Sequence, residues 1–446
     1  MPVLMLKQEA IKTLKLSAPI ILGELTQMSL GIINSAMVGH LDYRQLAASA
    51  LVNSVMNIPF VLGIGISMCI SQTVATANGK GDKGKVSHYF YNGIVLMIIT
   101  ALLISLLLEL IQPVLFHLGQ DRDVAILAGP YLRLMGFSVI PMLLFFALKQ
   151  FTDGLELTKT AMVLSIASMP LNVLFDYTFI FGHFGFPKME LLGAGIGTLV
   201  TRTLVLIVLG LIICFHPRFR PYMEERKKQW FLSRKTFQEL LHIGIPSGLQ
   251  GILEVAAFAV SGILAGQFSA IALASHQIAL QTAAFTFMVS MGLAQGASIR
   301  IGNAFGRKDW NQIRNIGKST FYTGLLYGVI CAILFVVFRN YLPLIFNKNI
   351  NVIAVTANLF LFAAIFQISD ATQAIGVGLL RGLKDVTAPT VYMAVAYWVL
   401  GIPIGWFLGF HFQWGVYGLW TGFVIGLSIV SILLNRRFNQ LTKRFV

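Results

Sequence analysis

Two carboxylates, Glu254 and Asp370, lie near the middle of long apolar segments and are the first candidates for chemistry in this chain. A charged side chain at the centre of a bilayer costs about 2.5 kcal/mol or more, so acids in such positions are functional by default. Ser369, Thr372 and Gln373 flank Asp370 and could add oxygen ligands of the kind that hard cations prefer. The residues predict a site for Na⁺ or H⁺. The alternative is that each carboxyl stays protonated and hydrogen-bonded as part of the packing.

The composition places these acids in a membrane. The chain of 446 residues is 56% hydrophobic and only 11% charged, with a mean hydropathy of +0.77. Soluble domains carry about a quarter of charged residues, so this chain could not keep its surface wet as a soluble globule. The composition therefore predicts a multi-pass membrane protein.

Apolar runs long enough to cross a bilayer recur along the whole chain. A helix needs about 20 residues to span the hydrocarbon core, and a barrel strand would instead alternate apolar and polar residues. We expect an all-α integral membrane protein with twelve transmembrane helices. The runs are residues 16–38, 46–75, 89–115, 124–148, 160–182, 192–215, 241–265, 270–302, 316–338, 352–380, 387–410 and 414–435.

The basic residues predict the orientation. Of 33 Lys and Arg residues, 25 lie in the two terminal segments and in the loops expected on the same side of the membrane, and these include Lys149 and Lys159. Only five lie in the loops on the opposite side. The positive-inside rule then places both termini in the cytoplasm. The net charge of +15 is explained by this topology, and we expect no nucleic-acid partner. The N-terminal apolar stretch continues into a full span with no small-residue cleavage site, so we expect the first helix to serve as the insertion signal.

The two halves of the chain resemble each other. Shifting the first half by 227 residues aligns ten identical residues, among them Pro19 with Pro246 and Asp82 with Asp309. We expect a six-helix lobe at 1–215, a cytoplasmic linker at 216–240 and a second six-helix lobe at 241–446. Because six is even, the lobes run in the same direction, and transporters built this way bind at the lobe interface.

The glycine-rich segment 79–85 (GKGDKGK) could be mistaken for a phosphate-binding loop. It lacks the preceding strand and the Gly-Lys-Ser/Thr ending that such a loop requires. Its counterpart at 306–309 (GRKD) occupies the same place in the second half. Both segments predict tight turns between helices.

Five stretches of the chain are similar to the multidrug and toxic compound extrusion (MATE) family, in its NorM-type branch. They keep the order and spacing of that family along nearly the whole chain. The stretches are PIILGELTQMSLGIINSAMVG at 19–39, MPLNVLFDYTFIFG at 169–182, LLGAGIGTLVTR at 191–202, GIPSGLQGILE at 244–254 and SDATQAIGVGLLRGLKDVTAPT at 369–390.

The resemblance implies a multi-pass antiporter of the inner membrane, with two pseudo-symmetric six-helix lobes around a central cavity. It would export lipophilic or cationic compounds in exchange for Na⁺ or H⁺ as the lobes rock, with no other cofactor. Its partners would be these small molecules and membrane lipids, and we expect a monomer. Glu254 and Asp370 match the second-lobe cation site of the family, whereas Asn172, Asp176 and Thr198 match its first-lobe polar cluster. Asp176 stands toward the outer end of its helix, where it could reach water.

The first helix departs from the family pattern. Asn34 stands where many members have an aspartate, and an amide neither titrates nor neutralises a cation. Glu24 stands where a neutral residue is expected. Ten residues place these two side chains about 80° apart around a helix and about 15 Å apart along it, so one does not replace the other. Phe366, four residues before Asp370, replaces a tyrosine of some relatives. The resemblance therefore leaves the part of the first lobe open.

Two other functions remain as alternatives. A flippase for lipid-linked oligosaccharides from the same superfamily would show cavity arginines that grip a pyrophosphate, whereas the mid-span charges here are acidic. A membrane enzyme would need paired aspartates for Mg²⁺ or a nucleophile with a histidine, and the sequence has no DDxxD, HExxH or GxSxG pattern. We therefore expect a transporter of cations rather than an enzyme.

Overall fold

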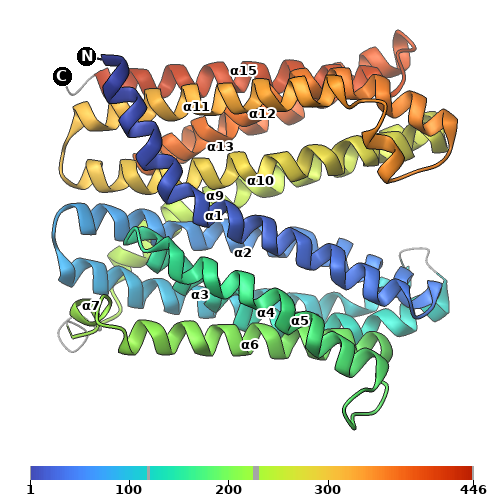
Figure 1. Ribbon diagram of the computed structural model, residues 1–446, viewed down its shortest axis with the longest axis horizontal. Coiled ribbons are helices and arrows are strands. Elements are labelled where there is room, and N and C mark those ends of the chain that lie inside the picture. Colours follow the sequence, from blue (N-terminus) through green and yellow to red (C-terminus); the bar gives the residue numbers. More distant parts are fainter. Residues whose placement is uncertain (1, 118–120, 225–230, 444–446) are drawn as a thin grey trace. The chain divides into compact units, whose positions relative to one another are not determined.

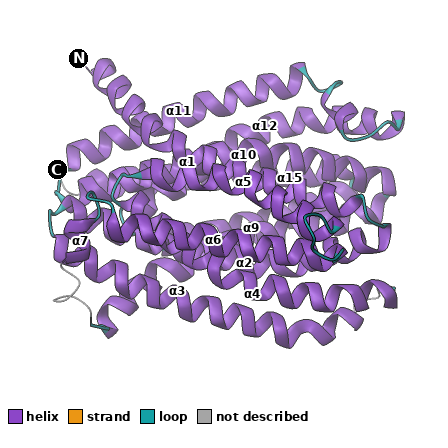
Figure 2. Cartoon of the chain, turned by 60° about the horizontal axis from the view of Figure 1, so that its bottom comes forward, coloured by secondary structure: helices purple, strands orange, loops and turns teal. Residues whose placement is uncertain are grey.

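The computed structural model describes residues 2–117, 121–224 and 231–443, and in these ranges it contains helices and no strand. Twelve of the described helical segments are long and apolar enough to cross a membrane. Figures 1 and 2 show them as long rods joined by short connections. The predicted all-α fold with twelve membrane-spanning segments is confirmed.

The six membrane-spanning helices of the first half each begin before the corresponding predicted apolar run. Their bounds are α1 (Pro2–Gly39), α2 (Tyr43–Gly79), α3 (Lys83–Ile111) with a 3₁₀ turn η1 (Gln112–His117), α4 (Arg122–Gly154), α5 (Thr158–Phe181), α6 (Glu190–Phe215) and the short α7 (Arg220–Glu224). The predicted linker 216–240 thus contains α7 and the first turns of α9, and its residues 225–230 lie outside the described ranges.

The helices of the second half include one that is interrupted. Their bounds are α9 (Arg234–Phe268), α10 (Ala270–Gly306), α11 (Trp310–Val337), η2 (Leu342–Ile345), α12 (Ile350–Gly382), then α13 (Thr387–Ala394), η3 (Val395–Gly401), α14 (Ile402–Trp406) and η4 (Phe407–His411), and finally α15 (Val416–Lys443). The segments η3 and η4 are π-helical turns within the eleventh span.

The glycine-rich segments form the tight turns that their sequence predicts. Gly81 has a φ of +71° and Lys308, 227 residues later, has a φ of +61°. Asp82 then accepts a hydrogen bond from the backbone N–H of Lys85 at 2.9 Å, and Asp309 accepts one from Gln312 at 2.9 Å. A carboxylate at the N-cap satisfies an otherwise unpaired N–H of the next helix. The internal repeat therefore extends to backbone geometry.

The chain packs as two compact units, residues 22–248 and residues 1–21 together with 249–446. Both boundaries fall inside a helix, two residues after the repeat-related prolines Pro19 and Pro246. The first helix of each half therefore begins in one unit and ends in the other. The lobes 1–215 and 241–446 remain a prediction, because the units defined by packing have different bounds.

Each unit contains part of a helix that continues into the other unit: residues 234–248 of α9 in one and residues 2–21 of α1 in the other. In both units this part packs against a glycine of a neighbouring helix. A Cβ atom on Gly65 of α2 would collide with the backbone of Gly248 in α9, and one on Gly292 of α10 would lie 3.0 Å from the Cα atom of Ile21 in α1. These four positions are related by the shift of 227 residues. Small residues let membrane helices approach this closely.

The unit of residues 22–248 is built around α4. This helix packs against α2, α3, α5 and α6, and Figure 1 shows α2 to α6 lying alongside one another in this unit. Near its C-terminal end, Phe151 is fully buried and stacks on Phe90 of α3, with 3.9 Å between ring centroids. The core of this unit therefore reaches the end of α4.

The other unit is centred on α12, which packs against α10, α11 and α15. The eleventh span of the chain, Thr387–His411, contacts α15 through a stripe of glycines on each side. Gly401 and Gly405 of the span face Gly418 and Gly422 of α15. Trp420, between them in sequence, is buried and donates a hydrogen bond from its indole N–H to His276 at 3.2 Å. Close glycine contacts and one satisfied polar pair thus hold α15 in place.

Candidate cation site

The structure brings Glu254 of α9 and Asp370 of α12 together within the unit that contains residues 249–446. The Asp370 side chain is buried and Glu254 is half-buried. Their two carboxyl groups are close enough for a negative charge on one to repel a negative charge on the other. Two carboxylates in a dry site repel each other, so a bound proton or cation stabilises the pair. This arrangement fits the cation site that the sequence predicts.

Tyr397 is a third member of the site that sequence reasoning missed. It is fully buried on the π-helical turn η3, and its hydroxyl interacts electrostatically with both carboxyl groups. The hydroxyl forms no well-aligned hydrogen bond, although it lies close to Glu254. Pro403 cannot donate an N–H to the preceding turn, which accounts for the widened helix. A tyrosine followed by a Gly-x-Pro sequence within a span is the signal that could have indicated it.

Several buried polar atoms around Asp370 have no hydrogen-bond partner. They are Oδ1 of Asp370, Nε2 of Gln367, Oε1 of Gln373 and the Tyr397 hydroxyl. Buried polar atoms are nearly always satisfied in native proteins, by protein, water or an ion. Three of these atoms are oxygens, which suit a small hard cation or a proton.

Two of the expected ligand side chains are engaged in helix packing instead. The Ser369 hydroxyl is hydrogen-bonded to Ser428 of α15 at 2.7 Å. The Thr372 hydroxyl donates to the carbonyl of Ile368 at 2.7 Å and accepts from Ser431 of α15 at 2.7 Å. Of the three flanking side chains named from the sequence, only Gln373 keeps an oxygen without a partner. The hydroxyls of Ser369 and Thr372 have partners because Ser428 and Ser431 of α15 lie beside them.

The first-lobe polar residues also meet, between α5 and α6. The Asn172 amide donates to Asp176 and to the hydroxyl of Thr201, both at 3.5 Å. Thr201 was not expected from the sequence, whereas Thr198 is buried one turn earlier with its hydroxyl unpartnered. Asp176 is fully buried against Gly197, so the expectation that it reaches water is wrong. The α5–α6 contact covers it.

Among the described residues, the two first-helix candidates form no hydrogen bond or ion pair with that cluster. Asn34 is half-buried, and its amide oxygen has no hydrogen-bond partner. Glu24 instead forms an ion pair with Lys149 of α4 at 3.0 Å. The prediction that Lys149 lies in a cytoplasmic segment is wrong, because this residue is buried within α4. The carboxylates of Glu24 and Asp153 hold it there.

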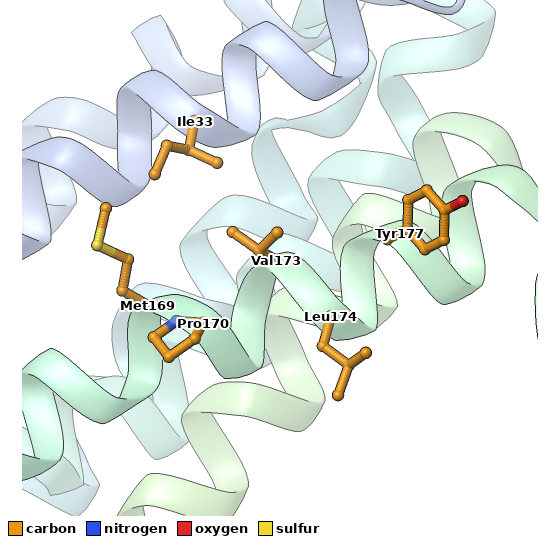
Figure 3. A pocket seen from close by; sticks show the side chains of 6 residues that line it. All are labelled: Ile33, Met169, Pro170, Val173, Leu174 and Tyr177. Atoms are coloured by element: carbon orange, nitrogen blue, oxygen red, sulfur yellow. The ribbon is translucent and has the colours of Figure 1, made fainter.

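An open pocket of about 550 Å³ lies between the end of α1 and α5 in the unit of residues 22–248. Figure 3 shows Met169 and Val173 pointing from α5 toward α1, which contributes Ile33. The lining is apolar, and it is completed by Pro170, Leu174 and Tyr177. Such a surface suits a lipophilic group or a lipid chain rather than an ion.

Twelve membrane spans with acidic residues buried inside the bundle are typical of the transporter class of membrane proteins. Within the described residues, no group of three or more His, Cys, Asp or Glu forms a multidentate metal site. The family model for MatE matches residues 19–178 and 246–407, most of the chain. The chain belongs to the MatE family, the MATE transporters.

Individual relatives agree with this assignment. The probable multidrug resistance protein NorM of Rhizobium meliloti is 33% identical over 97% of this chain and 93% of its own length. The multidrug resistance protein NorM of Vibrio cholerae is 31% identical over 98% of this chain and 97% of its own length. Among solved structures, the eukaryotic MATE transporter AtDTX14 has a TM-score of 0.87 at 22% identity and covers 99% of this chain and 100% of its own.

Proposed function

We propose that this protein exports lipophilic or cationic compounds across the inner membrane in exchange for Na⁺ or H⁺ bound at Glu254 and Asp370. The observation that carries the proposal is the meeting of two carboxyls and the Tyr397 hydroxyl, with oxygens that lack hydrogen-bond partners. The names of relatives that match nearly the whole chain, multidrug resistance proteins NorM, supply the class of substrate.

The coupling follows from differential binding. A cation that binds the acids more tightly in one arrangement of the lobes shifts the protein toward that arrangement. If a compound binds the opposite arrangement more tightly, each ligand lowers the affinity for the other by the same factor. Exchange rather than co-transport results. Rocking of the two lobes about a site near mid-membrane supplies the alternating access.

The orientation belongs to the same proposal. Both termini are cytoplasmic, because basic residues concentrate in the corresponding loops. Glu254 and Asp370 then receive the cation from outside. The polar residues Asn172, Asp176 and Thr198 form a second buried cluster to which substrate or cation could bind, and a monomer suffices for transport.

The decisive measurement is export of a fluorescent lipophilic cation from proteoliposomes with an imposed Na⁺ or H⁺ gradient. Glu254→Gln and Asp370→Asn keep the size of each side chain and remove its charge. We expect each variant to lose gradient-driven export by about tenfold or more, since a charge-assisted interaction contributes about 1.5–3 kcal/mol.

The matched control is Glu109→Gln. Glu109 pairs with Arg133 at an exposed position, so its substitution leaves export within about twofold, as expected for a surface ion pair. Gradient-driven export that survives both Glu254→Gln and Asp370→Asn would show that coupling does not use these acids.

A further inference from the structure

A second group of charged residues is buried in the unit of residues 22–248. Lys149 of α4 lies 3.0 Å from Glu24 of α1 and 3.7 Å from Asp153, one turn along α4. The side chains of Lys149 and Asp153 are 6% and 1% exposed, and that of Glu24 is 19% exposed. One ammonium therefore stands between two carboxyl groups inside the bundle.

Asp153 is the less tightly paired of the two acids in this group. Neither of its carboxyl oxygens has a hydrogen-bond partner, and its distance to the ammonium is long for an ion pair. The end of α4 is pressed against α2, because a Cβ on Gly154 would lie 2.9 Å from the carbonyl oxygen of Ser71. Ser165 of α5, which like Lys149 lies about 4 Å from the Cβ position of Gly23, also has a buried hydroxyl without a partner.

The charges in the group do not balance. Among the described residues, the charged groups that act on Asp153 are Lys149 from its own helix and Glu24 from α1. Two basic groups on helices packed against α4 have partners elsewhere: Arg202 of α6 donates to Ser138 at 2.6 Å, and His88 of α3 is hydrogen-bonded to Thr236 at 2.9 Å. Two carboxylates and one ammonium leave one uncompensated negative charge. An unpaired charge of this kind is strongly unfavourable in a dry interior.

We propose that Glu24, Lys149 and Asp153 form a proton-binding site that holds one exchangeable proton, separate from the pair Glu254 and Asp370. The ammonium already occupies the position between the carboxyls where a Na⁺ ion would bind, so a proton is the cation that fits. Lys149 can pair with either acid, and the acid that it leaves takes the proton. The partial exposure of Glu24 provides the route of exchange.

The proposal is tested by infrared difference spectroscopy of the purified full-length chain as the pH is changed, a measurement that requires no transport. Glu254→Gln, Asp370→Asn and Asp176→Asn are combined in one background protein. Their amides replace the other buried acids without a basic partner, so those positions contribute no carboxyl band. We expect the background protein to show the C=O band of a protonated carboxyl that disappears at alkaline pH. Failure of the proposed export function would not affect this band.

Variants in that background test how many protons the group of Glu24, Lys149 and Asp153 binds. Asp153→Asn and Glu24→Gln should each abolish the band, because one acid and one ammonium balance. Lys149→Gln should double its amplitude, because both acids must then be neutral. The matched control Glu156→Gln removes an exposed acid three residues from Asp153 and should leave the band unchanged.

Three outcomes would overturn the proposal. They are a background protein with no such band, a band that persists in folded Asp153→Asn, and a band that Na⁺ but not choline removes at constant pH. If Asp153→Asn does not fold, Asp153→Glu is used instead. That variant should keep the band at a shifted frequency, and an unshifted band would assign the proton to another residue.

Discussion

The buried acids of the two units are compensated in different ways. Glu24 and Asp153 share Lys149, whereas Glu254 and Asp370 have no salt-bridge partner among the described residues. A pair of carboxyls without an internal cation requires one from solution. This difference supports the proposal that Glu254 and Asp370, rather than Glu24 and Asp153, bind the ion that drives transport.

Tyr397 should tune the binding of that cation. Tyr397→Phe removes one hydroxyl without changing the packing, and we expect the affinity for the coupling cation to fall by about tenfold, equivalent to roughly 1.4 kcal/mol. The measurement is export rate against Na⁺ concentration or pH in proteoliposomes. Tyr417→Phe is the control, because Tyr417 stacks on Phe362 outside the site. Equal cation dependence in both variants would remove Tyr397 from the site.

At the scale of elements, the eleventh span is placed by its glycine contact with α15. The span is interrupted by two π-helical turns, and its position against α15 is what holds Tyr397 near the acids. In lipid, helix association depends on close packing rather than on the hydrophobic effect. The glycine stripes therefore matter for the site as well as for stability.

Gly422→Ala tests this contact. A Cβ at Gly422 would lie 2.6 Å from the Cα atom of Gly405, and overpacking of this kind costs about 1–3 kcal/mol. We expect a lower free energy of unfolding, measured by thermal denaturation in detergent. The control is Gly266→Ala, whose new Cβ would lie at an ordinary 3.6 Å from Leu273. If both variants are equally stable, the glycine stripes are not what sets the helix distance.

At the scale of the whole molecule, α1 belongs to two units and is held in each by a buried ion pair. Its N-terminal part is fixed by Arg300 of α10, which donates to the Glu9 carboxylate, to the Glu9 carbonyl at 2.8 Å and to Thr13 at 2.6 Å. Its C-terminal part is fixed by Glu24 and Lys149. The chain therefore joins its two units through a helix anchored on both sides of Pro19.

Breaking the first anchor should destabilise the protein through the loss of a buried charge-assisted contact. We expect Arg300→Gln to lower the free energy of unfolding by about 1–3 kcal/mol, because the Glu9 carboxylate then keeps only the exposed Lys12 as a partner, at 2.9 Å. The double variant Glu9→Gln/Arg300→Gln should be more stable than Arg300→Gln. Thermal denaturation of the native chain, both single variants and the double variant measures this coupling, and simple additivity would contradict it.

Local features of the sequence were enough for much of this structure. The apolar runs predict the twelve spans, and the turns at 79–85 and 306–309 follow from glycine and capping aspartates. Glu254 and Asp370 stand out because a mid-span acid is conspicuous against an apolar background. Span length and turn chemistry depend on neighbouring residues in the chain, so the sequence alone determined them.

Other features depend on which helices face each other, and only the tertiary structure decided them. The partners of Ser369 and Thr372 come from α15, and the neighbours of Lys149 come partly from α1. Tyr397 approaches the acids because the eleventh span widens and packs as it does. In uniformly apolar helices the sequence carries little indication of which face is inward. The side-chain contacts between helices, and with them the composition of both charged sites, therefore required the folded chain.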